Sequence, residues 1–200
     1  LSMYAGLRPL AVSSGDQTKT KEISRSHKII IAASGLITIT GGKWTTYRKM
    51  GEDVVDQAIK TGKLNAKPST SEHLSIHGNQ DTTHLPHHLS IYGTDIALLE
   101  KLSRENPAWQ APLCEGLEFS IAQVIFAIQH EMARTVEDIL SRRVRVLYVD
   151  ARKAMAVAPL VASLLAQQLG KDEAWEKQQI DDFYEVAKGY LPVPMARPTR

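Results

Sequence analysis

Cysteine and long apolar runs are what the sequence most clearly lacks. Cys114 is the single cysteine among 200 residues, which excludes an intrachain disulfide and is typical of a reducing compartment. No apolar run reaches the roughly 20 residues that a membrane-spanning helix needs. The longest run, residues 154–166, contains Pro159 and predicts a buried, kinked helix. We therefore expect a cytoplasmic protein, with peripheral association with the cytoplasmic membrane as an option.

An excess of charge of one sign is also missing. The formal net charge is only +2, so we expect no nucleic-acid partner. The glycine-rich fingerprints of dinucleotide and phosphate sites are absent, as is the Gly-x-Ser-x-Gly nucleophile motif. Hydrophobic residues make up 43% of the chain, enough for a packed core. The chain starts with Leu1 rather than Met, and we expect it to begin inside a longer protein.

The most informative motif that is present is the turn Gly41-Gly42-Lys43. It follows a β-branched run, residues 36–40, and precedes a helical pattern. A strand that turns on two glycines into a helix presents backbone N–H groups and the positive end of the helix dipole to an anion. Lys43 adds a full positive charge. The motif predicts a site for an anionic ligand or for a group that develops negative charge, and a plain tight turn is the alternative.

Hydrophobic periodicity predicts an α+β fold that is predominantly α. Two β-rich runs around Ser34-Gly35 predict a hairpin, and the helix after it is expected to last to Thr61, with Gly62 as its stop signal. We divide the chain into the end of a ligand-binding domain, a linker, an α-helical domain and a flexible tail: residues 1–62, 63–90, 91–191 and 192–200.

The helical domain carries its own start and stop signals. A helix over residues 151–169 should end at Gly170, and Asp172 should cap a last helix. Thr135 and Asp138 have the spacing of a capping box. One apolar stripe has helical spacing and predicts a further helix: Ile121, Val124, Ile125 and Ile128.

Two groups of basic residues are candidate binding sites. Arg8, Arg25 and Lys43 could together hold a phosphate, and three solvated surface cations are the alternative. A second cluster contains Arg142, Arg143 and Arg145 and suggests docking on a partner or an anionic membrane. Acidic residues are interleaved with this cluster, and a salt-bridge network is the stronger interpretation.

Histidines gather in the predicted linker at His73, His77, His84, His87 and His88. No cysteine accompanies them, and zinc sites need fixed geometry and supporting hydrogen bonds. We interpret them as loop residues and expect no metal.

Three blocks of the sequence, residues 6–10, 24–48 and 131–143, resemble the C-terminal part of the FAD-dependent glycerol-3-phosphate dehydrogenases, the quinone-linked aerobic enzymes. The resemblance implies a D-amino-acid-oxidase-like domain for FAD and substrate, of which residues 1–62 are the end. It also implies the helical C-terminal domain that follows. FAD is expected in the full-length enzyme and not on this piece alone, because most of the FAD site would lie upstream.

The resemblance also assigns roles to individual residues. Arg8 and Arg25 would bind the substrate phosphate, and Lys43 would lie beside the flavin as a catalytic residue. Cofactor contacts would come from the turn and the helix start that follows it, at Gly41, Gly42, Lys43, Thr45 and Thr46.

The partners implied are glycerol 3-phosphate and a quinone. Two alternatives stay open: an oxidase of the same family that uses oxygen, and a helical interaction module for dimerisation or membrane docking.

Overall fold

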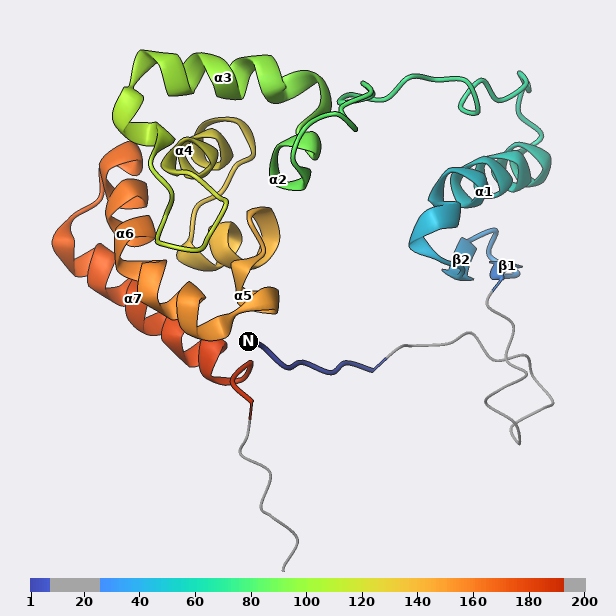
Figure 1. Ribbon diagram of the computed structural model, residues 1–200. Coiled ribbons are helices and arrows are strands. Elements are labelled where there is room, and N and C mark those ends of the chain that lie inside the picture. The colour runs from blue at the N-terminus through green and yellow to red at the C-terminus, as the bar shows by residue number, and fades with distance from the viewer. Residues whose placement is uncertain (8–25, 193–200) are drawn as a thin grey trace, which may run out of the picture. The chain divides into compact units, whose positions relative to one another are not determined.

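The computed structural model in Figure 1 describes residues 1–7 and 26–192. They form two compact units, one made of Gly6–Ile76 and the other of Leu1–Ala5 with His77–Arg200. We call them the hairpin–helix unit and the helical unit, and we describe each by itself. The predicted fold class is confirmed: the protein is mostly helical, with an N-terminal two-stranded antiparallel hairpin. The roles assigned to the four sequence segments stay predictions.

The hairpin consists of β1 (His27–Ile31) and β2 (Ile37–Gly41), with Ile29 paired to Ile39. At the turn, the Gly35 N–H donates to the Ala32 carbonyl at 2.9 Å, and Gly35 adopts a φ of 86°. The Ala32 N–H also donates to the Leu36 carbonyl at 2.9 Å. The loop between these two residues therefore has three residues, rather than the two that Ser34-Gly35 suggests. A left-handed glycine after a tight turn restores the strand pairing.

A short 3-10 turn, Trp44–Thr46, leads from the hairpin into α1 (Tyr47–Gly62). The helix ends one residue later than predicted, because Gly62 is its last residue and Lys63 takes the left-handed conformation with a φ of 51°. The Leu64 N–H then donates to the Ile59 carbonyl at 3.0 Å. This is a Schellman cap formed without glycine at the left-handed position.

The hairpin–helix unit has no buried core among its described residues. No residue of β1, β2 or α1 is buried. Large apolar side chains are exposed along all three elements and beside them: Ile30, Ile31, Leu36, Trp44, Tyr47 and Val55. Three short elements cannot enclose a core, so this unit offers apolar surface that a larger domain would cover.

The helical unit contains a continuous core. Its helices are α2 (His87–Ser90), α3 (Ile96–Glu105), α4 (Ile121–His130), α5 (Val146–Val149), α6 (Ala151–Leu169) and α7 (Glu173–Lys188), with a π-helical turn at Asp138–Arg143. The helices α6 and α7 pack side by side, and α4 lies inside the unit (Figure 1). No helix in the described part of the chain is long and apolar enough to cross a membrane.

The predicted helix limits in this unit are confirmed, and so is the helix that the apolar stripe predicts. The helix α6 ends at Leu169, with Gly170 as its cap at a φ of 63°, and the Asp172 side chain caps α7 by accepting from the Trp175 N–H at 2.9 Å. The helix α4 contains this stripe, and residues 122–128 are all buried, so its buried surface extends beyond the stripe. Helices on both sides cover it, α3 on one and α6 on the other.

The predicted capping box between Thr135 and Asp138 is also confirmed. The Thr135 N–H donates to Asp138 Oδ2 at 3.1 Å, and the Asp138 N–H donates to Thr135 Oγ1 at 3.0 Å. Burial alone would raise the pKa of Asp138. Hydrogen bonds from Arg134 and Thr135, with the Arg142 guanidinium nearby, hold that pKa below its ordinary value.

Asp138→Asn is therefore expected to lower the free energy of unfolding by about 1 kcal/mol at pH 7, the usual effect of losing a helix cap. A carboxylate with a lowered folded-state pKa stabilises the fold above its unfolded pKa, near 4, and this stabilisation is lost as pH falls through the folded value. Thermal unfolding at pH 7 and pH 3 measures it, and the difference from wild type should shrink at pH 3. Asp181→Asn, on the exposed side of α7, is the matched control. An equal loss at both pH values would contradict the assignment.

Candidate functional site

The glycine turn lies where β2, β1 and α1 meet. Gly41 and Gly42 have φ values of 79° and 78°, which favour glycine. A Cβ on Gly42 would overlap the Met50 sulfur and would lie 2.9 Å from Met50 Cε and 3.3 Å from His27 Cβ. The backbone conformation therefore favours glycine at position 42, and a Cβ there would make the flexible end of the Met50 side chain move and would lie close to His27.

Lys43 precedes the 3-10 turn and is tied to its last residue. The Lys43 N–H donates to Thr46 Oγ1 at 3.2 Å, and that hydroxyl donates to the Lys43 carbonyl at 3.0 Å. Residues 43–46 are all exposed, and the Trp44 side chain is 90% exposed. The Thr46 hydroxyl thus holds the turn together, whereas the Lys43 and Thr45 side chains stay accessible to a ligand.

The predicted site residues are placed only in part. Gly41, Gly42, Lys43, Thr45 and Thr46 belong to this one turn. Arg8 and Arg25 lie outside the described residues, so their approach to a phosphate stays a prediction.

Sequence reasoning missed an ion-pair cluster that joins the hairpin to α1. His27 Nε2 lies 3.0 Å from Asp53 Oδ2, and Lys49 Nζ lies 3.0 Å from Asp53 Oδ1. Hydrogen bonds with Glu52 and then with Asp53 raise the pKa of Lys49 to about 12. The Lys49 ammonium in turn holds the pKa of Asp53 below its ordinary value. The Lys49/Asp53 spacing of four residues signals this pair, but nothing in the sequence signals the His27 contact.

An open groove of about 600 Å³ runs along α1, beginning at Tyr47 directly after the turn. Its apolar lining comes from α1 and from the segment that follows: Tyr47, Val55, Ile59, Leu74 and Ile76. Arg48 donates to Ser71 Oγ at 3.1 Å and ties this segment to the helix. The groove adds to the apolar surface of the hairpin–helix unit.

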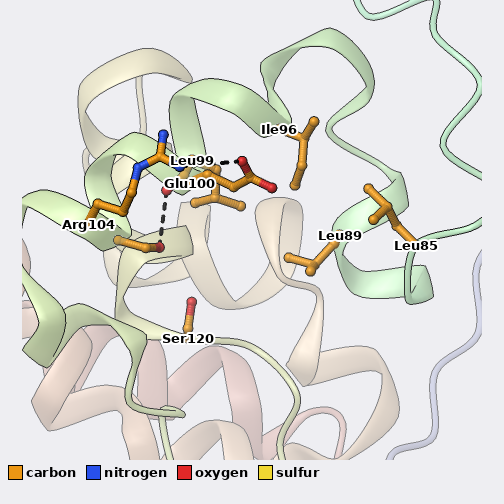
Figure 2. A pocket seen from close by; sticks show the side chains of 8 residues that line it. Leu85, Leu89, Ile96, Leu99, Glu100, Arg104 and Ser120 are labelled. Carbon is orange, nitrogen blue, oxygen red and sulfur yellow. Dashed lines mark hydrogen bonds and ion pairs between the residues drawn. The ribbon is translucent and has the colours of Figure 1, made fainter.

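The helical unit has a smaller pocket of about 280 Å³, which Figure 2 shows from close by. Its walls are mainly leucine and isoleucine from α2, α3 and the residues around them: Leu85, Leu89, Ile96 and Leu99. Glu100 and Arg104 stand at its edge, 3.9 Å apart. The pocket has room for a small apolar group, and its charged residues neutralise each other.

The arginine cluster of the helical unit is held mainly by acidic side chains. Arg142 lies 2.6 Å from Glu137 and 3.1 Å from Asp138, and Arg143 lies 3.6 Å from the Glu131 carboxylate. Burial raises the pKa of Glu131, and the Arg143 charge opposes this rise. The salt-bridge interpretation is confirmed for Arg142 and Arg143, which weakens the case for membrane docking through them.

Arg134 does not form the side-chain ion pair with Asp138 that its spacing predicts. Its guanidinium instead donates to the backbone carbonyls of Ile128 and Ala133, at 3.0 and 2.8 Å, and closes the end of α4.

In the predicted linker, His77 pairs with Asp95 at 2.7 Å. Within residues 1–7 and 26–192, no group of three or more His, Cys, Asp or Glu side chains is arranged to hold a metal ion.

The sequence matches a known family of C-terminal domains. Residues 36–176 match the family described as the C-terminal domain of alpha-glycerophosphate oxidase, so the match starts beside β2 and extends into α7. The chain belongs to this family, the C-terminal domain of FAD-dependent glycerol-3-phosphate dehydrogenases and oxidases.

Curated relatives are similar to the chain over nearly its whole length. It is 32% identical to the mitochondrial glycerol-3-phosphate dehydrogenase of Macaca fascicularis and 31% identical to that of Homo sapiens, with 100% of this chain and 29% of each relative covered. The corresponding protein of Arabidopsis thaliana is 30% identical over 94% of this chain and 35% of its own length. The chain thus spans about a third of the length of these relatives.

Proposed function

We propose that the chain is the C-terminal part of an enzyme that oxidises sn-glycerol 3-phosphate to dihydroxyacetone phosphate through FAD, with a quinone as electron acceptor. Membership of the family and the names of the relatives support the substrate. The observation that carries the proposal is the left-handed turn Gly41-Gly42, which brings bare backbone and the accessible Lys43 to the start of α1.

The turn suits a flat, electron-accepting ring. Gly41 is exposed and carries no side chain that would hold a ring away from the backbone, and residues 43–46 are also exposed. When bound, FAD supplies the chemistry by accepting a hydride from the C2 carbon of the substrate. Lys43 and the N–H groups at the start of the 3-10 turn would stabilise the negative charge that the ring gains. Thr45 would add a hydroxyl donor, and Arg8 and Arg25 would bind the substrate phosphate.

The exposed apolar surface explains why this turn is proposed to form only one wall of the site. Neither strand nor α1 buries a residue, and a groove of about 600 Å³ lies along α1. The hairpin also has open edges that a larger sheet would pair. We infer that the rest of the FAD domain covers these surfaces in the full-length enzyme, and that the 200 residues alone are inactive.

The first test is the visible spectrum of the purified 200-residue chain mixed with FAD and then desalted. We expect no flavin absorbance to remain with the protein, because one wall alone gives few contacts. The full-length enzyme, treated in the same way, is the control and should stay yellow. Stoichiometric flavin on the 200-residue chain would show that the missing walls are not needed.

Oxygen as acceptor is the second candidate, because the matching family is named after an oxidase. The reaction is the same for both acceptors until the flavin is reduced. Measuring oxygen uptake against quinone reduction by the full-length enzyme separates them: rapid uptake without quinone would favour the oxidase.

A further inference from the structure

We infer that His27 is a positioning residue, which fixes the direction of the Gly41-Gly42-Lys43 turn through its hydrogen bond to Asp53. This inference rests on the proposed function, because it gives the turn a flavin to face. It adds a residue of β1 to the site and assigns it no contact with substrate or cofactor.

The strand register places His27 beside the turn. His27 is the first residue of β1 and pairs with Gly41, the last residue of β2. Its Cβ is also one of the atoms that a Cβ on Gly42 would meet, at 3.3 Å. His27 therefore borders both glycines of the turn.

The ring of His27 reaches the helix that follows the turn. An ionised carboxylate only accepts hydrogen bonds, so His27 Nε2 donates to Asp53 Oδ2, at 3.0 Å. The other carboxylate oxygen of Asp53 is bound by Lys49 at 3.0 Å. Asp53 lies between the first and the last turn of α1 and is held on both sides, so it gives His27 a fixed anchor.

Among the described residues, several connections hold the hairpin against α1. They include the chain itself through residues 43–46, Met50 against Gly42, and His27 with Asp53. The strands β1 and β2 and the helix α1 bury none of their residues, so a single polar connection contributes more to their relative direction than it would inside a packed domain. An ordinary exposed ion pair would be worth little and would leave the turn unchanged when removed.

The test compares His27→Ala with His27→Gln, whose side-chain amide nitrogen can replace Nε2 as the donor to Asp53. Amide NMR spectra of the isotope-labelled 200-residue chain report on the turn without FAD. We expect His27→Ala to move the Gly42 and Trp44 amide signals and His27→Gln to restore them largely. Lys101→Ala, which removes an exposed pair with Glu105 in α3, is the matched control and should move neither signal.

The same variants in the full-length enzyme test the consequence for the flavin. We expect His27→Ala to shift the visible absorbance of bound FAD and to lower kcat about tenfold with little change in KM, as a misplaced catalytic group does. His27→Gln should recover most of both.

Three outcomes would overturn the inference. The turn signals could stay in place in His27→Ala, or His27→Gln could behave like His27→Ala. In the third, the turn signals move but the flavin spectrum and kcat do not. If Lys43→Ala lowers kcat in that last case, the proposed function stands and only the positioning role fails. If Lys43→Ala is also silent, the proposed function fails with it.

Discussion

Lys43→Ala in the full-length enzyme is expected to lower kcat for glycerol 3-phosphate oxidation by about a hundredfold, the usual effect of removing one group that stabilises developing charge. Lys43 is exposed at the start of the 3-10 turn, and its backbone is held by Thr46. The substitution therefore removes the charge and leaves the turn in place. Because the charge acts on the reduced ring rather than on the bound substrate, KM should change little.

Steady-state kinetics with a saturating quinone measure this effect. Lys43→Arg keeps the positive charge and should retain much of kcat. Arg8→Ala should give the opposite pattern, a raised KM, because a lost phosphate contact weakens substrate binding. A normal kcat for Lys43→Ala would exclude the catalytic role, and a KM effect alone would move Lys43 to the substrate phosphate.

The hairpin, the turn and α1 could be predicted from the sequence because local signals determine them. Two β-branched runs around a glycine specify the hairpin, and Gly41-Gly42 marks the end of its second strand. The helix α1 extends one residue beyond its predicted end at Thr61, because Lys63 rather than Gly62 takes the left-handed cap position. Glycine is the residue most often found at this left-handed position, but the two backbone hydrogen bonds of the cap also form when lysine occupies it.

Contacts between distant segments could not be predicted in the same way. Gln123 is fully buried in α4, where its amide donates to the His88 carbonyl at 2.9 Å and to the Tyr92 hydroxyl. From the sequence alone, a polar residue between apolar positions is assigned to the solvent-facing side of a helix, because the distant groups that can bind it are not visible there. The His27–Asp53 hydrogen bond escaped prediction for the same reason, since 26 residues separate its two ends.

Gly42→Ala is expected to have the second large effect, a loss of most of the FAD from the full-length enzyme. An alanine at a φ of 78° costs on the order of 1–2 kcal/mol, and its methyl group would also overlap the Met50 side chain. The flexible end of Met50 can move to relieve this overlap, but this end packs α1 against Gly42, and the methyl group would still lie 3.3 Å from His27 Cβ.

Gly35→Ala separates the two contributions. Gly35 has a φ of 86°, but a Cβ there meets nothing within 4 Å, so this variant carries the conformational cost without the overlap. Flavin absorbance per protein, measured after gel filtration, should fall strongly in Gly42→Ala and only slightly in Gly35→Ala. Adding Met50→Ala to Gly42→Ala removes the overlap but not the strain and should restore part of the flavin. If Gly42→Ala retained as much FAD as Gly35→Ala, the packing of Gly42 between Met50 and His27 would not matter for flavin binding. That result would contradict the assignment of the turn to the flavin site.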